Sequence, residues 1–254
     1  MQRIETNRVY NENCIETMRR MPDNYVDLVV TSPPYDGLRK YNGFCLDFQL
    51  ICMELTRTLK EGGVIVWITG DATVDGSETC TSFKNAMLFM SLGLKLWDTM
   101  IWEKTGRLPT QNRYYNCFDY MFVLSKGKPK SMNFICDNKN TDKPRSRIRY
   151  SKCSKEGGAR TEKRFMTQEF SRRSNVWKIP NNINKTEHPA VFPEKLANDH
   201  IITWSNPGDI VYDPFAGSGT TAKMSILNGR QWIASEISPE YCEIIKERLS
   251  GLHD

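Results

Sequence analysis

One short segment of the sequence combines a hydroxyl, two prolines and an aromatic ring. Ser32-Pro33-Pro34-Tyr35 follows the β-branched run 26–30, with only Thr31 between them. Prolines fix the backbone and leave their carbonyls able to accept hydrogen bonds. The Ser32 hydroxyl and the Pro33 carbonyl could therefore accept the two hydrogens of a ring-bound amino group and help it become tetrahedral. Tyr35 could stack on the ring face, and an ordinary proline turn is the competing interpretation.

A second segment is rich in glycine and lies between a predicted strand and a predicted helix. Backbone N–H groups at a helix N-terminus attract an anionic group, and Gly217-Ser218-Gly219 would let it approach closely. The triphosphate pattern GxxxxGK[ST] is absent. Glu236 ends the next predicted strand, where an acid can bind ribose hydroxyls. With Asp213 before the loop, these residues favour an adenosine-type cofactor over a simple tight turn.

Both segments need a sheet that places them at strand ends. Strands alternate with helices, which predicts an α/β fold with a mostly parallel sheet and helices on both faces. We predict seven strands, with the active site at their carboxyl ends. Strands are expected at 8–10, 26–30, 64–69, 94–102, 120–124, 209–212 and 231–234, and helices at 46–59, 82–92, 192–204, 239–249 and from the glycine segment to 228.

Charge is distributed unevenly along the 254 residues. The chain carries a net charge of +5, but residues 126–180 alone hold 16 Lys and Arg against 5 Asp and Glu. Tyr150, Phe165, Phe170 and Trp177 are interspersed among these charges. This segment lacks the periodicity of the rest and is predicted to be an insert that contacts a nucleic acid. A solvated basic loop is the competing interpretation.

Several classes of protein are disfavoured by composition. No two of the eight cysteines are spaced as CxxC, and the three histidines do not complete a ligand pattern, so no metal site is expected. No apolar run approaches the ~20 residues of a membrane span. The first residues have no apolar signal core, so we expect an intracellular, cytoplasmic protein associated with the nucleoid.

Taken together, these motifs resemble those of the S-adenosylmethionine-dependent DNA amino-methyltransferases with permuted motif order, the β arrangement. Thr31-Ser32-Pro33-Pro34-Tyr35 resembles the catalytic motif of that family, and residues 213–221, DPFAGSGTT, resemble its cofactor loop. Residues 188–196 resemble the HPxxxPxxL segment that precedes this loop. The resemblance covers nearly the whole chain. It implies a circularly permuted, Rossmann-like methyltransferase fold with S-adenosyl-L-methionine as cofactor.

The resemblance also implies a division of the chain and a role for individual residues. Residues 1–126 would form the catalytic half, 127–180 a target-recognition segment and 181–254 the cofactor-binding half. The implied catalytic residues are Ser32, Pro33, Pro34 and Tyr35. The implied cofactor-binding residues are Asn13, Cys14, Thr31, His188, Pro189, Asp213, Phe215, Gly217, Ser218, Gly219, Thr220 and Glu236. The candidate nucleic-acid contacts are Arg39, Lys40, Arg145, Arg147, Arg149, Arg172 and Arg173.

The substrate implied by the resemblance is a base flipped out of double-stranded DNA. Family members with serine before the two prolines mostly methylate N4 of cytosine, so Ser32 favours that atom over N6 of adenine. An RNA substrate and a catalytically silent nucleic-acid-binding protein are the remaining alternatives. A cognate restriction endonuclease and a homodimer are possible partners by the same resemblance.

Overall fold

The computed structural model describes residues 4–34, 47–108, 112–140, 146–150, 162–166, 168–180 and 193–252. These fall into two compact units. The larger comprises Met1–Asn133 with Asn175–Asp254, and the smaller is Phe134–Ser174. The smaller unit is narrower than the expected segment 127–180, because residues 127–133 and 175–180 pack with the larger unit.

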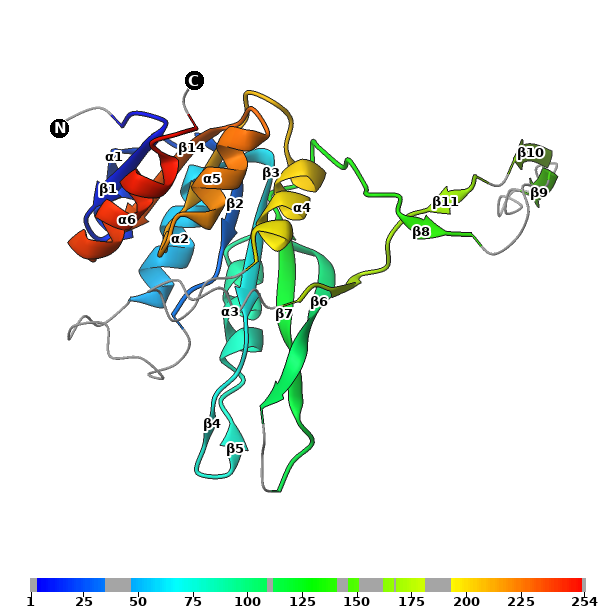
Figure 1. Cartoon of the computed structure of the whole chain (residues 1–254), viewed down its shortest axis with the longest axis horizontal. Coiled ribbons are helices and arrows are strands. Elements are labelled where there is room, and N and C mark those ends of the chain that lie inside the picture. The colour runs from blue at the N-terminus through cyan, green and yellow to red at the C-terminus, as the bar shows by residue number, and fades with distance from the viewer. Residues whose placement is uncertain are drawn as a thin grey trace. The chain divides into compact units, whose positions relative to one another are not determined.

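The larger unit is built on one twisted sheet (Figure 1). Five strands in it are mutually parallel, and toward the other end one long strand runs antiparallel to both of its neighbours. This arrangement confirms the expected α/β methyltransferase-like fold. In spatial order the strands are β1 (Arg8–Asn11), β14 (Gln231–Glu236), β13 (Ile210–Asp213), β2 (Val26–Thr31), β3 (Leu59–Thr69), β7 (Asn116–Ser125), β6 (Lys95–Leu108) and β12 (Val176–Lys178).

The sheet contains one strand more than the seven expected. The additional strand is β12, which pairs in parallel with β6 at the end of the sheet. It has three residues and no apolar run, so its sequence gives no strand signal by itself. Trp177 is buried in the core there and its ring stacks on that of His200 at 4.5 Å. The strand is thus held by backbone pairing with β6 and by burial of the Trp177 side chain.

Helices cover both faces of the sheet, as alternation along the strands requires. On one face, Val29 and Tyr212 pack with helices α1 (Cys14–Arg20), α2 (Phe48–Thr58) and α3 (Thr81–Ser91). On the other face, Val30 and Val211 pack with helices α4 (Glu194–Trp204) and α5 (Thr220–Leu227), and Trp232 packs with α6 (Pro239–Leu249). Helix α1, seven residues long, was not among the expected helices.

The strand order reverses between β13 and β2. These neighbours are parallel, with Val211 opposite Leu28 and Tyr212 opposite Val29. The chain leaves β13 through α5 toward β14, whereas it leaves β2 through α2 toward β3 on the opposite side. Doubly wound sheets bind ligands at such a switch point, outside the carboxyl ends of the strands. The fold therefore places the Ser32 segment and the glycine segment at neighbouring strand ends.

The smaller unit consists of antiparallel strand pairs without a helix among its described residues. Strand β8 (Asn138–Lys139) pairs with β11 (Phe170–Ser171), and β9 (Ser146–Tyr150) pairs with β10 (Glu162–Met166). In the larger unit, β4 (Thr73–Val74) and β5 (Ser77–Glu78) form a short hairpin. None of the helices in the described part of the chain is long and apolar enough to cross a membrane.

Candidate active site

The ends of β2 and β13 are joined by a hydrogen bond between side chains. The Thr31 hydroxyl donates to Asp213 Oδ1 at 2.7 Å, and the Phe215 amide donates to the same oxygen at 3.0 Å. Ser32 follows Thr31 directly in the chain. The start of the predicted catalytic segment and the start of the predicted cofactor loop are therefore held together, although 182 residues separate them in sequence.

Asp213 carries a carboxylate oxygen with an unfilled hydrogen-bonding capacity. The side chain is 1% exposed, and its Oδ2 atom has no hydrogen-bond partner among the described residues. The nearby Thr221 hydroxyl donates to the Val30 carbonyl at 3.1 Å. Burial raises the pKa of the Asp213 carboxyl to about 6, and the hydrogen bond from Thr31 opposes this rise. Such an oxygen suits a cationic donor, such as the ammonium group of a bound amino acid.

The glycine loop adopts a backbone that side chains would obstruct. Gly217 and Gly219 have φ values of 52° and 77°, in the left-handed region. A Cβ atom on Gly219 would also lie 3.0 Å from Cγ1 of Ile245. The turn closes through a hydrogen bond from the Gly219 amide to the Ala216 carbonyl at 2.8 Å. Helix α5 begins at Thr220, so the first amides of the helix lie at the end of this loop.

Glu236 holds the glycine loop from the end of the adjacent strand. Its Oε2 atom accepts from the Gly217 amide at 2.8 Å, and its Oε1 atom accepts from the Ser238 amide at 2.9 Å. The side chain is 8% exposed, and burial raises the pKa of its carboxyl. Each carboxylate oxygen has a second lone pair, which leaves capacity for a ribose hydroxyl. The side chain of Asn11 donates to the Glu236 carbonyl at 2.9 Å and supports the same turn.

The two residues expected in the adenine pocket have structural contacts of their own. Asn13 caps helix α1, where its side-chain oxygen accepts from the Ile15 amide at 2.9 Å. Cys14 packs in the hydrophobic core, and burial raises the pKa of its thiol to about 12. Both lie just beyond the carboxyl end of β1, which pairs with β14 so that Asn11 is opposite Glu236. Their position near the Glu236 turn fits the sequence expectation, and contact with adenine stays a prediction.

The catalytic segment is only partly described. Pro33 is buried, whereas Ser32 and Pro34 are half-buried at the carboxyl edge of β2. Several residues predicted from the sequence lie outside the described part of the chain: Tyr35, Arg39, Lys40, Arg145, His188 and Pro189.

The described basic residues of the smaller unit differ in their surroundings. The Arg172 guanidinium lies 4.3 Å from the centroid of the Phe134 ring. Arg173 instead donates to Asp137, with Nε at 3.1 and 3.0 Å from the two carboxylate oxygens. Arg147 and Arg149 lie on β9, opposite Phe165 and Lys163. Arg173 is thus part of the internal structure of the unit, and Arg172 is an exposed cation fixed by an aromatic ring.

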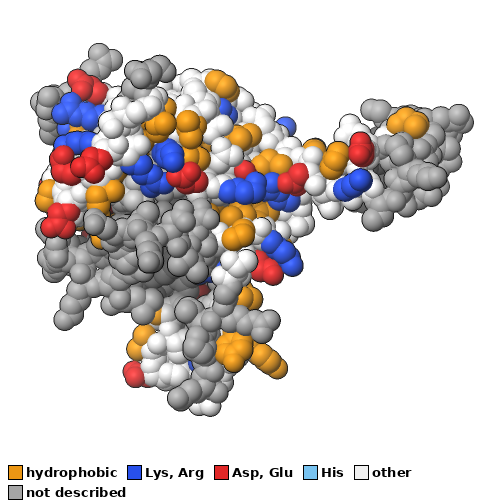
Figure 2. All heavy atoms as spheres, in the orientation of Figure 1, with side chains coloured by type: hydrophobic (Ala, Val, Ile, Leu, Met, Phe, Trp, Pro, Cys, Tyr) orange, Lys and Arg blue, Asp and Glu red, His pale blue; other side chains and the backbone are white. Residues whose placement is uncertain are grey.

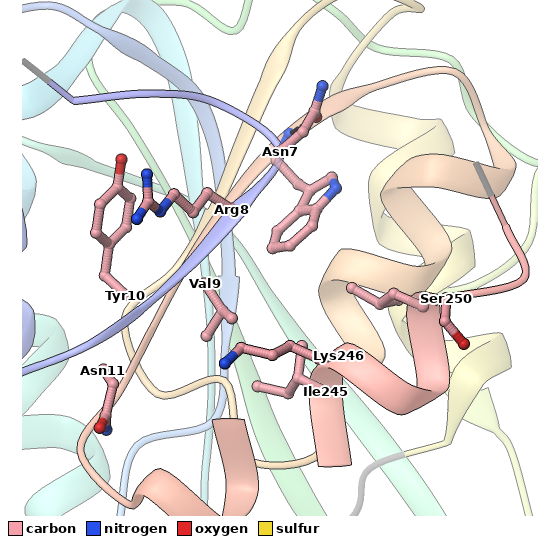
Figure 3. A pocket seen from close by; sticks show the side chains of 10 residues that line it. Asn7, Arg8, Val9, Tyr10, Asn11, Ile245, Lys246 and Ser250 are labelled. Carbon is pink, nitrogen blue, oxygen red and sulfur yellow. Dashed lines mark hydrogen bonds between the residues drawn. The ribbon is translucent and has the colours of Figure 1, made fainter. Parts of the chain in front are cut away.

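A cavity lies between helix α6 and strand β1 (Figure 3). It has a volume of about 470 Å³, and Arg8, Trp232 and Lys246 are among the residues that line it. Among the residues predicted to bind the cofactor, none of those that the structure describes lines it. We therefore distinguish this cavity from the site at the carboxyl edge. The described residues contain no cluster of three His, Cys, Asp or Glu side chains that could hold a metal ion.

Sequence reasoning missed Arg248, which contacts the glycine loop from helix α6. Its Nη1 atom donates to the carbonyl and the hydroxyl of Ser218, each at 2.9 Å. The only local signal is that Ile245 and Arg248 are three residues apart and share a helix face. Nothing in the sequence indicates which loop that face would contact.

Comparisons with known proteins agree with this geometry. A family model described as DNA methylase, of the N6 and N4 type, matches residues 26–247. The orphan methyltransferase M.BamHII of Bacillus amyloliquefaciens is 52% identical over an alignment of 240 residues, and the match covers 90% of each chain. The type II methyltransferase M.BglII of Bacillus subtilis is 27% identical and aligns with 98% of this chain and 70% of its own. The structure of the PvuII DNA methyltransferase (cytosine-N4-specific) superimposes with a TM-score of 0.70 at 20% identity, covering 98% of this chain and 92% of its own.

Proposed function

This chain belongs to the N6- and N4-type DNA methylase family, and from that premise we propose that it methylates the exocyclic N4 of cytosine in a base flipped out of double-stranded DNA. Membership confirms the coarser expectation that the chain is an S-adenosylmethionine-dependent DNA amino-methyltransferase. The choice of cytosine, the roles of single residues and the division at residues 126 and 180 are part of the proposal.

The observation that carries the choice of base is the serine before the two prolines. Ser32 is half-buried and directly follows Thr31, whose hydroxyl is bound to Asp213. In the family that this chain resembles, serine at this position goes mostly with N4-cytosine and aspartate mostly with N6-adenine. A neutral hydroxyl and a carboxylate both accept hydrogen bonds from an amino group. Hydrogen-bonding chemistry alone does not choose between the two bases, so the proposal is tested by identifying the methylated product.

The residues at the carboxyl edge fit the cofactor. The unpaired Asp213 Oδ2 would accept from the ammonium of the methionine part, and Glu236 would accept from the ribose hydroxyls. Gly217 and Gly219 would let the methionine part pass close to the loop backbone. When bound, S-adenosylmethionine supplies an electrophilic methyl group on its sulfonium. Nothing in this arrangement requires a covalent bond between enzyme and base.

The chain's own part in the transfer is to hold the amino group. The Ser32 hydroxyl and the Pro33 carbonyl accept its two hydrogens and favour a tetrahedral nitrogen with an available lone pair. Buried Pro33 fixes the position of its carbonyl. The bound cofactor would supply the methyl group to this nitrogen and leave as a neutral thioether, and one N–H proton would pass to solvent. Tyr35 would stack on the flipped base.

DNA binding is proposed for the basic segment 127–180. Its excess of Lys and Arg suits the phosphate backbone. Within it, Arg172 is the best described candidate contact, and Arg147 and Arg149 lie on strand β9. Arg39, Lys40 and Arg145 stay predictions. So do a cognate restriction endonuclease and a homodimer, which co-purification and light scattering would test.

The deciding experiment is identification of the methylated nucleoside. The purified protein is incubated with S-adenosylmethionine and unmethylated genomic DNA, which is then digested to nucleosides for mass spectrometry. N4-methylcytosine is the expected product. N6-methyladenine would overturn the choice of base and leave the family unchanged. A matched RNA duplex tests the RNA alternative, and the Ser32→Ala variant serves as the control for contaminating activity.

A further inference from the structure

We propose that Arg248 is a positioning residue for the methyl donor. Its guanidinium fixes the backbone of the glycine loop and thereby sets the affinity for S-adenosylmethionine. The inference rests on the proposed cofactor role of the loop. Arg248 lies on α6, on the side of the loop where Ile245 also packs. It is not part of the motifs that identify the family in this sequence.

The contacts of Arg248 reach both sides of Gly219. Its Nη1 atom donates to the Ser218 carbonyl and hydroxyl at 2.9 Å each, and it lies 3.3 Å from the Thr220 hydroxyl. Fixing the Ser218 carbonyl fixes the peptide plane that leads into Gly219. One charged group thus restrains the backbone between the two left-handed glycines and the first residue of α5.

A second element anchors Arg248 itself. Its Nη2 atom donates to Glu194 Oε1 at 2.6 Å, and the Lys223 ammonium donates to the same oxygen at 2.7 Å. Glu194 is the first residue of α4, and Lys223 lies on α5. Burial raises the pKa of the Glu194 carboxyl, but the hydrogen bonds from Lys223 and Arg248 outweigh it and lower the pKa. Charged side chains of both signs lie side by side on the face that carries α4, α5 and α6 (Figure 2).

The loop needs such a brace because its own residues provide little restraint. Gly217 and Gly219 have no side chains, and glycine has the largest backbone entropy to lose on ordering. Helix α6 supplies an apolar contact through Ile245 and a polar one through Arg248, three residues further on the same face. Without the guanidinium, the loop would sample conformations that do not bind the cofactor, and the apparent affinity would fall with the fraction of competent loop.

The test compares four variants by titration calorimetry with S-adenosylmethionine. Arg248→Ala removes the brace, Arg248→Lys keeps the charge, and Glu194→Gln weakens the anchor only. Lys246→Ala is the matched control, because Lys246 lies on the same helix and pairs with Glu243 instead. Melting temperature, the dissociation constant for DNA and kcat at saturating cofactor are measured alongside.

We expect Arg248→Ala to weaken cofactor binding about tenfold, the size of one lost charge-assisted hydrogen bond. Arg248→Lys should recover part of the loss, and Glu194→Gln should lose about threefold. DNA affinity and kcat at saturating cofactor should stay as in the unmodified protein. A structural role alone would instead lower the melting temperature and affect cofactor and DNA binding together.

Two results separate the inference from the proposed function. If the unmodified protein binds the cofactor and Arg248→Ala binds it equally well, the inference is wrong and the proposed function stands. If the unmodified protein neither binds S-adenosylmethionine nor transfers its methyl group, the proposed function fails. Should Arg248→Ala not fold, equal cofactor affinities of Arg248→Lys, Glu194→Gln and the unmodified protein would overturn the inference.

Discussion

The glycine loop and the smaller unit place their charges in opposite ways. Asp213 and Glu236 are buried and accept hydrogen bonds from the backbone of the loop. Arg172 in the smaller unit is exposed, and Arg173 is paired with the half-exposed Asp137. Buried charges act at short range in a low dielectric, whereas exposed charges act over a Debye length and are screened by salt.

This difference matches two kinds of ligand. A small molecule of fixed shape is bound by a few prearranged groups, and burying those groups costs the protein folding free energy. A long polyanion is bound by many exposed cations, each contributing little. Changes in the first region should therefore have large effects at single residues, and changes in the second should have small, salt-dependent ones.

The largest effect is expected for Ser32→Ala. Loss of one acceptor for the amino group should lower kcat about 100- to 1,000-fold, as for a donor removed from an oxyanion hole. Affinity for the cofactor should not change, because Ser32 does not belong to the glycine loop or to the residues proposed to bind the cofactor. Methyl transfer from labelled cofactor and titration calorimetry measure the two quantities. An unchanged kcat would remove Ser32 from the active site.

Asp213→Asn should weaken cofactor binding at least tenfold, because it removes the charge facing the ammonium. It should also stabilise the protein without cofactor. Burial raises the pKa of Asp213 to about 6, above the ordinary 3.8, so stability present below pH 3.8 is lost as the pH rises through 6. The cost above pH 6 is about 3 kcal/mol.

Thermal melts at two pH values test this prediction. The melting temperature of Asp213→Asn without cofactor should exceed that of the unmodified protein at pH 8, and the difference should shrink at pH 5. The cofactor should stabilise the unmodified protein more at pH 8 than at pH 5. A difference that is independent of pH would show that the Asp213 carboxyl is not responsible.

Gly219→Ala should lower the free energy of unfolding by about 1–3 kcal/mol through backbone strain and contact with Ile245. Gly229→Ala is the matched control, because its φ is 71° but its Cβ would lie 3.8 Å from the nearest atom. The difference between the two variants in denaturant unfolding isolates the contact with Ile245. An equal decrease in the free energy of unfolding for both variants would mean that α6 does not pack closely against Gly219.

The smallest effect is expected in the smaller unit. Arg172→Ala should weaken DNA binding several-fold and reduce the slope of log K against log salt by about 0.9, the value for one phosphate. Arg173→Ala should change that slope less, because Arg173 is already paired with Asp137. Fluorescence anisotropy at several salt concentrations measures both. A larger change of slope for Arg173 than for Arg172 would reverse this assignment.

The sequence alone was sufficient for seven of the eight strands of the main sheet and for the position of the Ser32 and glycine segments at strand ends. All seven expected strands are present, and helix α6 has the expected bounds. These features are local: an apolar run makes a buried strand, and glycines between a strand and a helix make a tight loop. The motifs also led to the family, because their residues are contiguous in the chain.

The features that the sequence did not reveal depend on partners far away in the chain. Strand β12 pairs with distant β6 and buries Trp177 against His200, and helix α1 is too short for a clear helical period. The bond from Thr31 to Asp213 and the brace from Arg248 to Ser218 join segments from different parts of the chain. Side-chain chemistry is fixed by sequence, but which groups meet is decided by the packing of distant elements. Only the tertiary structure could therefore identify the groups that hold the glycine loop.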